Sequence, residues 1–378
     1  MAKVNDFQIF VPSLFIWIVN VKICSSQQQE PNQDNTTAGY DYDESTIDYS
    51  MYADYCEKAV NRQFRLWFIP LPCTIIFVLG LVGNCLVIFT FLYFRRLKTM
   101  TDVYLLNLAF ADLLFTLTLP FWAANSMANW LLGLVMCKAM YTVHKVTFYS
   151  SIFLLSCISV DRYFAITKAV SAHRHRTKTA LLSKLSSAII WAGALVFSAP
   201  EMVYTTIHHG TCTPYSHRNS SYSLRVSIQS TQIALGFVVP LLVMTFCYSA
   251  IAMTLRQSRS FERNRAFKVI LAVVATFLFC QVPYTLCLFV STLDAASGGS
   301  GDCSHQKALL FANDVTQFLA VCRCCLNPLV YGFIGVKFRQ DVLKLMREVG
   351  CLTYERFCKY SSRKSSVVET ETTTTFSP

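Results

Sequence analysis

The sequence has few charged residues for its length. Only 15% of its 378 residues are Asp, Glu, Lys or Arg, whereas 53% are hydrophobic. Soluble globular domains contain about 25% charged residues, and disordered segments have low hydrophobicity. The composition therefore excludes an ordinary soluble enzyme, a disordered protein and a fibre. The net charge of +11 would indicate a nucleic-acid partner only in a soluble chain, so we expect no such partner.

Charges are scarcest in long apolar blocks of roughly 20 residues or more. Blocks of this length match the hydrocarbon thickness of a bilayer, and only helices satisfy their own backbone groups there. We predict an all-α membrane protein, a seven-transmembrane helix bundle over residues 66–335. The expected spans are roughly Leu66–Tyr93, Val103–Met127, Leu131–Ile166, Leu181–Val203, Ile228–Leu255, Ala266–Leu293 and Ala308–Gly335.

An eighth and shorter apolar block, Phe7 to Val21, lies near the N-terminus behind Lys3. A short apolar block behind a basic start is typical of a secretory signal peptide, which we place at residues 1–24. Pro12 and Lys22 fit that pattern poorly. An additional amphipathic or spanning helix therefore remains the alternative.

Lys and Arg are nearly absent from every second loop between the spans. They cluster in the first, third and fifth loops and in the tail after the last span. Cytoplasmic loops carry the excess of Lys and Arg in membrane proteins. We therefore predict a multi-pass protein of the plasma membrane with its N-terminus outside and its C-terminus in the cytoplasm.

The segment 23–57 contains no Lys or Arg, but it contains eight acidic residues and five tyrosines. We interpret residues 25–65 as an acidic extracellular arm that attracts a basic partner through its opposite charge. The alternative is a solvated tail without a partner. If the arm binds a partner, the candidate contact residues are Tyr40, Asp41, Tyr42 and Asp43. The two tyrosines are also candidates for sulfation. Two glycosylation sequons also fall on the predicted outer side, at Asn35 and Asn219.

Four cysteines lie in segments that we expect outside the membrane, where oxidation favours disulfides. They are Cys56, Cys137, Cys212 and Cys303. Four cysteines allow three pairings. We predict Cys137–Cys212, between the third span and the second outer loop, and Cys56–Cys303 as the remaining bridge.

Ionisable residues inside spans are functional candidates, because burying them in a membrane is costly. Asp112 and Arg323 should face the bundle interior, where they could form an ion pair. Lys145 lies about two turns from Cys137, at a depth suited to an outer cavity. Its neighbour His144 either lines that cavity or is a hydrogen-bonded interior histidine. We expect a polar network formed by Asn84, Asp112, Ser151 and Arg323.

Prolines interrupt five of the spans, and kinked helices suit a protein that switches between two packings. They are Pro120, Pro200, Pro240, Pro283 and Pro328. After the last span, residues 336–348 have the pattern of an amphipathic interfacial helix. Residues 349–378 form a Ser/Thr-rich cytoplasmic tail, which is either a phosphorylation target or an inert spacer. The candidate phosphorylation sites are Ser361, Ser362, Ser365, Ser366, Thr372, Thr373, Thr374 and Thr375. Cys351 and Cys358 are either palmitoylated or free thiols.

Motifs spread over about residues 60–350 resemble the rhodopsin-like seven-helix receptors. The motif residues are Gly83-Asn84, Leu108 to Asp112, Cys137, Asp161-Arg162-Tyr163, Trp191, Pro240, Tyr248, Pro283, Asn327-Pro328 and Tyr331. The segments DRYFAI and TLPFW and the extra Cys56/Cys303 pair are similar to the chemokine-receptor branch. The resemblance implies CC chemokines as ligands, an inhibitory-type G protein, receptor kinases and arrestin as partners, and directed leukocyte migration with calcium signalling as the output.

The resemblance also implies roles for single residues. Arg162 would release Asp161 on activation and meet the G protein, while Tyr248 and Tyr331 rearrange around it. Tyr163, Asn327 and Pro328 belong to the same set of coupling and activation residues. Ligand contacts are expected at Trp122, His144, Lys145, Gln281, Asp314 and Gln317.

Three positions depart from the family pattern. Gln281 stands where a Trp is common, and Gln317 stands where many chemokine receptors have a Glu, for which Asp314 could substitute. Arg323 stands near Asp112, the position of the family's sodium ligand. A fixed cation there would make sodium redundant by like-charge repulsion.

Other functional classes have less support. A retinal pump needs a Lys in the middle of the seventh span, which has Lys307 only at its edge, and inverted repeats of a transporter are not evident. A non-signalling scavenger receptor is a nearer alternative. No metal-ligand spacing, cofactor motif or nucleophile–base pattern points to an enzyme.

Overall fold

The computed structural model describes residues 70–95, 99–127, 130–167, 176–208, 210–214, 222–257, 261–297, 303–348 and 350. These residues belong to one compact unit, Cys56–Pro378. The predicted signal peptide, the acidic arm and, apart from Gly350, the Ser/Thr-rich tail lie outside the described residues.

Seven helices in this part of the chain are long and apolar enough to cross a membrane. They are Pro70–Phe94, Met100–Asn125, Gly133–Thr167, Leu181–Tyr204, Val226–Thr254, Lys268–Asp294 and Ser304–Ile334. They correspond one to one to the predicted spans and differ from them by a few residues at the ends. The predicted all-α, seven-helix membrane architecture is therefore confirmed.

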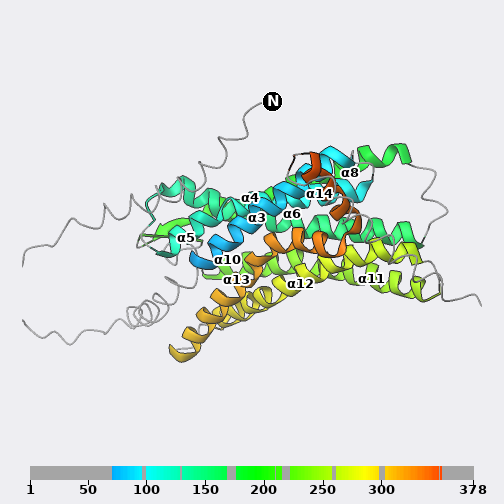
Figure 1. The fold of residues 1–378 in the computed structure, drawn as a ribbon. Coiled ribbons are helices and arrows are strands. Elements are labelled where there is room, and N and C mark those ends of the chain that lie inside the picture. Colours follow the sequence, from blue (N-terminus) through cyan, green and yellow to red (C-terminus); the bar gives the residue numbers. More distant parts are fainter. Residues whose placement is uncertain are drawn as a thin grey trace, which may run out of the picture. The chain divides into compact units, whose positions relative to one another are not determined.

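Several of these spans are divided into shorter elements (Figure 1). The elements are α3 (Pro70–Thr90), η1 (Phe91–Arg95), α4 (Met100–Thr116), α5 (Leu119–Met127), α6 (Gly133–Thr167), α8 (Arg176–Phe197), α9 (Ala199–Tyr204), β1 (Thr206–His208), β2 (Thr211–Thr213), α10 (Tyr222–Ile233), η3 (Ala234–Val238), α11 (Val239–Gln257), α12 (Phe261–Ala296), α13 (Cys303–Ile334) and α14 (Val336–Glu348).

Local sequence explains where some of these elements begin. Thr99 precedes α4, and its hydroxyl accepts a hydrogen bond from the backbone N–H of Asp102 at 3.1 Å. The Asp102 carboxylate in turn accepts from the backbone N–H of Thr99 at 3.2 Å. This reciprocal capping box satisfies backbone donors that a helix start leaves unpaired.

The five prolines affect their helices differently. Breaks or widened turns precede Pro120, Pro200 and Pro240, where α4 gives way to α5, α8 to α9, and the π-helical turn η3 leads into α11. Proline lacks the N–H of a regular helix, so the preceding turn loses a bond. Pro283 and Pro328 instead lie inside the continuous helices α12 and α13.

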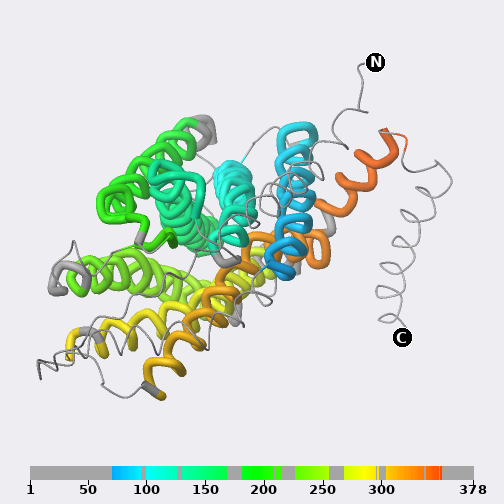
Figure 2. The backbone as a smooth tube through the Cα atoms, turned by 90° about the vertical axis from the view of Figure 1, so that its left-hand side faces the viewer, coloured from blue at the N-terminus to red at the C-terminus, as the bar shows by residue number. Residues whose placement is uncertain are grey.

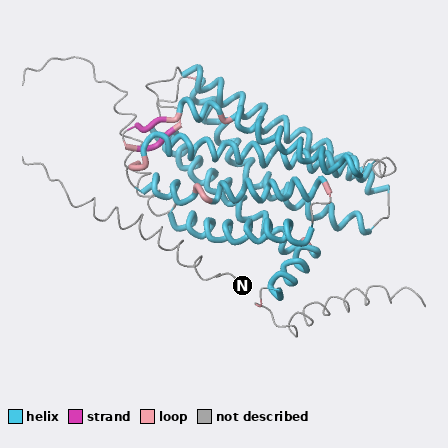
Figure 3. Tube along the Cα trace, turned by 90° about the horizontal axis from the view of Figure 1, so that it is seen from above, coloured by secondary structure: helices cyan, strands magenta, loops and turns pink. Residues whose placement is uncertain are grey.

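Helix α6 packs against α4, α8 and α11, whereas α13 packs along α12 and α3 (Figure 2). The largest buried cluster joins α4, α6 and α12 through residues such as Leu108, Ile152 and Phe277. The antiparallel strands β1 and β2 lie at one end of the helices (Figure 3).

Large apolar side chains also cover the outward faces of the helices. Leu71, Val82, Phe246 and Phe279 are all exposed, and they lie on three different spans. Apolar patches of this extent mark a surface that meets another apolar phase. This pattern is the one that a lipid-facing surface requires.

Helix α14 occupies the residues for which we predict the amphipathic helix. It follows Gly335, and its Phe338 is buried against Tyr331 with ring centroids 6.0 Å apart. A Cβ at position 335 would lie 2.5 Å from the Tyr331 carbonyl oxygen, so glycine permits the close turn between α13 and α14. Its position at the membrane surface remains a prediction.

Candidate functional site

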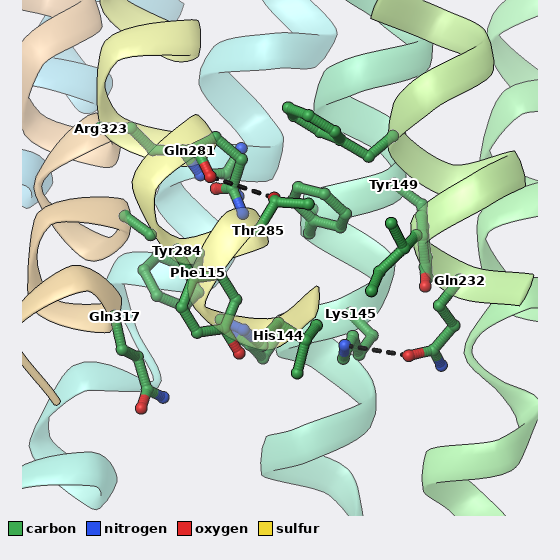
Figure 4. A pocket seen from close by; sticks show the side chains of 15 residues that line it. Phe115, His144, Lys145, Tyr149, Gln232, Gln281, Tyr284, Thr285, Gln317 and Arg323 are labelled. Atoms are coloured by element: carbon green, nitrogen blue, oxygen red, sulfur yellow. Dashed lines mark hydrogen bonds between the residues drawn. The ribbon is translucent and has the colours of Figure 1, made fainter. Parts of the chain in front are cut away.

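A cavity of about 560 Å³, counting its solvent-open part, lies between α6, η3, α12 and α13. It is nearer the end of α6 that carries Cys137 than the end that carries Arg162. The lining includes four of the predicted ligand contacts and one member of the predicted polar network (Figure 4): His144, Lys145, Gln281, Gln317 and Arg323. The structure therefore brings together residues from three helices that are far apart in the sequence.

Lys145 is held by two polar residues that were not among the predicted site residues. Its Nζ donates to Oε1 of Gln232 at 3.2 Å and lies 3.8 Å from Oε1 of Glu201. Gln232 closes the triangle, because its Nε2 donates to the same Glu201 oxygen at 2.9 Å. Glu201 is only 1% exposed. An acidic residue inside the apolar segment 181–203 was the signal that could have identified it.

His144 lies in an aromatic cluster beside the cavity. Its ring centroid is 5.2 Å from that of Phe115 and 5.4 Å from that of Trp122. Its Nδ1 has no hydrogen-bond partner among the described residues. Trp122, a predicted ligand contact, packs on His144 and Tyr141 and is not among the residues that line the cavity.

Asp314 lies on α13, one helical turn from Gln317, and it is buried. It is not among the residues that line the cavity. The structure thus separates the two α13 positions that we expect to contact ligand, since only Gln317 reaches the lining.

The buried Asp112 and Arg323 do not form an ion pair within 4.0 Å in this structure. Asp112 Oδ2 instead accepts from Asn327 Nδ2 at 2.7 Å. The Arg323 guanidinium lies over two rings, 5.7 Å from the centroid of Phe148 and 5.4 Å from that of Phe277. Arg323 is 3% exposed, so aromatic faces rather than water surround most of it.

The other two members of the predicted polar network make local contacts. Asn84 Nδ2 donates to the carbonyl oxygens of Gly80 at 2.9 Å and Cys324 at 2.8 Å, which ties α3 to α13. The Ser151 hydroxyl donates to Thr147 on its own helix at 2.7 Å.

At the opposite end of α6, Arg162 is bound to its neighbour. Its Nη2 lies 2.6 Å from Oδ2 of Asp161. Thr101 on α4, which was not among the predicted site residues, donates to the same Asp161 oxygen at 2.6 Å and accepts a hydrogen bond from Arg162. We name this set the Thr101–Asp161–Arg162 network. It connects the end of α6 to α4.

The other motif residues lie on α6 itself, on α11 and on α13. The Ser159 hydroxyl donates to the Tyr248 oxygen of α11 at 3.1 Å. Tyr163 packs against Phe246 with ring centroids 5.9 Å apart. On α13, Tyr331 is buried one turn beyond Pro328, and it contacts Phe338 of α14.

The predicted disulfide between Cys137 and Cys212 is present, with the two Cα atoms 5.7 Å apart. It joins the start of α6 to β2, where Asn125 Nδ2 also donates to the Cys212 carbonyl oxygen at 3.2 Å. The second predicted bridge, Cys56–Cys303, stays a prediction, because Cys56 and the side chain of Cys303 lie outside the described part of the structure. So do the arm contacts, both glycosylation sequons and the tail phosphorylation sites.

Comparison with known proteins adds to this geometry. Residues 83–331 match the family model "7 transmembrane receptor (rhodopsin family)". The chain is 46% identical to C-C chemokine receptor type 7 of Homo sapiens over 357 residues, which are 92% of this chain and 94% of that protein. The bovine (Bos taurus) protein of the same name is 48% identical over 357 residues, again 92% of this chain and 94% of that protein.

A sheep (Ovis aries) protein, C-C chemokine receptor type 9, is 38% identical over 335 residues, 88% of this chain and 90% of its own. These relatives are receptors, and the family is not one of enzymes. The family match, the seven spans and the identity over nearly the whole length agree. The chain therefore belongs to the rhodopsin family of seven-transmembrane receptors and, within it, to the chemokine receptors.

Proposed function

We propose that this protein is a G-protein-coupled receptor for CC-type chemokines. Its N-terminus lies outside the cell, and chemokine binding is transmitted to an inhibitory-type G protein and to arrestin. The output is directed leukocyte migration and calcium signalling. The names of its relatives, which include C-C chemokine receptors types 7 and 9, support the ligand class.

Binding proceeds in two steps. The acidic arm, with Tyr40, Asp41, Tyr42 and Asp43, attracts the basic body of the chemokine, because opposite charges speed encounter. The flexible amino terminus of the ligand then enters the cavity beside Lys145 and Gln317. The Cys137–Cys212 bridge supports this step by joining α6 to the β1–β2 segment at the same end.

The single observation that carries the signalling proposal is the Thr101–Asp161–Arg162 network. The network occupies the guanidinium of Arg162 with contacts to Asp161 and Thr101. These contacts are side chain to side chain, so a helix movement can exchange them for contacts to a G protein. A ligand shifts such an equilibrium only by its difference in affinity for the two states. Phosphorylation of the tail by receptor kinases then creates the anionic site for arrestin.

A scavenger receptor that takes up chemokine without signalling is the competing function. The test expresses the full chain in cells and applies a panel of CC chemokines. The readouts are G-protein activation, directed migration and chemokine uptake. We expect at least one chemokine to activate the inhibitory-type G protein. Uptake without G-protein activation would instead identify a scavenger.

A matched pair of variants connects the signal to the network. Arg162→Ala should abolish G-protein activation while chemokine binding persists. Lys184→Ala, which removes an exposed cation from α8, should leave both unchanged. If Arg162→Ala activates the G protein as the unmodified receptor does, the proposed role of the network is wrong.

A further inference from the structure

The cavity is lined by cations and not by acids. Among its lining residues, Lys145 and Arg323 are cationic, and none is Asp or Glu. The remaining polar lining consists of neutral amides, hydroxyls and one histidine. A ligand group that enters such a cavity meets a positive field unless each cation is compensated from behind.

The positive charge of Lys145 is compensated by residues behind the cavity wall. Glu201, which does not line the cavity, lies 3.8 Å from its ammonium, and Gln232 accepts from the same group at 3.2 Å. Little of the Lys145 charge is therefore left for a guest in the cavity.

Within the described part of the chain, Arg323 has no carboxylate in direct contact, although Asp112 acts on it electrostatically within the same buried region. Among the described residues no carboxylate lies within 4.0 Å of it, and its nearest defined contacts are the rings of Phe148 and Phe277. Its Nη1 is buried without a hydrogen-bond partner in this structure. Buried charged groups are normally paired and hydrogen-bonded. This guanidinium thus has unused capacity to donate, in a cavity that a ligand can enter.

Asp112 does not use this capacity directly. One of its carboxylate oxygens is occupied by Asn327, and the other has no partner among the described residues. If Arg323 served only to balance Asp112, a direct ion pair would be the arrangement of lowest energy for two charges in a medium of low dielectric. The structure instead keeps Arg323 at the cavity wall.

We propose that the part of the cavity around Arg323 binds a carboxylate carried by the amino-terminal segment of the chemokine. This inference rests on the proposed function and specifies its ligand class: chemokines with Asp or Glu among the first few residues, in place of ligands that depend on their terminal ammonium alone. The neutral Gln317 fits this assignment, because an amide provides no counter-charge for an ammonium. Gln281, also buried in the lining, adds a neutral polar partner.

The test uses the full-length receptor in membranes and one chemokine that binds it in the panel above. Two synthetic versions of that chemokine differ only near the amino terminus, where one carries Asp or Glu and the other the corresponding Asn or Gln. Binding affinity and potency in G-protein activation are measured on three receptors: the unmodified chain, Arg323→Gln and Arg323→Lys.

We expect the acidic version to be about tenfold or more the stronger ligand on the unmodified receptor, the effect of one charge-assisted hydrogen bond. Arg323→Gln should reduce the ratio between the two versions to about one, whereas Arg323→Lys should retain most of it. The ratio reports the contact itself, because a general loss of folding lowers both affinities together.

An equal ratio on the unmodified receptor and on Arg323→Gln would overturn the proposal, and so would the absence of any preference on the unmodified receptor. If Arg323→Gln does not reach the cell surface, the affinity ratio between the two chemokine versions is compared on the unmodified receptor and on Arg323→Lys. A different result, in which no chemokine of the panel binds, would contradict the proposed function itself. Binding without preference for the acid would contradict only this inference.

Discussion

Two single residues determine the charge of the cavity, and the composition of the sequence could not show where either of them lies. Arg323 is a cation at the cavity wall between two aromatic rings, and Glu201 is an acid behind the wall, beside Lys145. Each was placed by a few interhelical contacts. Their charges have specific consequences for ions and for stability.

Arg323 should make the receptor insensitive to sodium. Its fixed positive charge lies in the same buried region as Asp112, and it disfavours a second cation there. We expect agonist affinity to stay constant when sodium replaces N-methylglucamine at equal ionic strength. Arg323→Gln should acquire a sodium effect. Strong weakening of agonist binding by sodium on the unmodified receptor would refute this expectation.

Glu201 and Lys145 should depend on each other for stability. Removing one member of a buried ion pair leaves an uncompensated charge, at a cost of roughly 3 kcal/mol. We expect Glu201→Ala to lower the melting temperature of the purified receptor, and the double variant Glu201→Ala/Lys145→Met to recover most of that loss. Thermal unfolding in detergent measures the melting temperatures of the single and the double variant. Additive losses in the double variant would show that the pair is not coupled.

At the scale of elements, helix ends and close helix contacts determine what can move. The Thr101–Asp161–Arg162 network connects α6 to α4, and the Ser159–Tyr248 bond connects α6 to α11. Both join different helices through side chains. They are therefore the contacts that a shift between helices must break.

Thr101 should hold the receptor in its resting state. Thr101→Val removes the hydroxyl that donates to Asp161 and accepts from Arg162 but keeps the shape of the side chain. We expect higher G-protein activation in the absence of chemokine, because one contact that restrains Arg162 is lost. Thr254→Val is the control, since that hydroxyl bonds only within its own helix. Unchanged basal activation in Thr101→Val would contradict the role given to Thr101.

Gly83 should be required for the approach of α3 to α13. A Cβ at this position would lie 2.8 Å from Cβ of Pro328, which is too close for the two helices to keep their spacing. We expect Gly83→Ala to destabilise the receptor by about 1–3 kcal/mol, the usual effect of overpacking. Gly193→Ala is the matched control, because nothing lies within 4 Å of its added Cβ. Equal melting temperatures for the two variants would exclude a tight contact at Gly83.

At the scale of the whole molecule, orientation in the membrane gives the direction of the signal. The asymmetry of Lys and Arg between loops predicts an outer N-terminus. Asn35 and Asn219 would then lie on the outer side, and glycosidase treatment should lower the apparent mass of the receptor. Asn35→Gln and Asn219→Gln should each remove one glycan. A receptor without glycans whose tail is reached by protease on intact cells would have the opposite orientation.

Much of the fold could be predicted from the sequence because its determinants are local. The seven apolar blocks and the prolines that interrupt five of them are features of short stretches of chain. The motif around Arg162 could also be identified in the sequence, because Asp161, Arg162 and Tyr163 are consecutive residues. The disulfide partner Cys212 was one choice among a few cysteines.

The site was predicted less completely. His144, Lys145, Gln281 and Gln317 line one cavity, whereas the predicted contacts Trp122 and Asp314 are not among its lining residues. Arg323, which we expected in the polar network with Asp112, lines the same cavity. Their roles as ligand contacts stay predictions. Helical position alone does not determine which side of a helix faces a cavity. Contacts between helices, such as Trp122 on His144, decide this, and their partners are distant in the sequence.

The sequence by itself determined the number of spans, their approximate positions and the family, because hydropathy and motifs act over one turn to one span. Only the tertiary structure decided how the charges are partnered. It placed Glu201 behind Lys145, joined Thr101 to Arg162, and kept Arg323 on aromatic faces instead of on Asp112. The physical reason is that a buried charge is stabilised by whatever lies within a few ångströms, and those neighbours come from other helices.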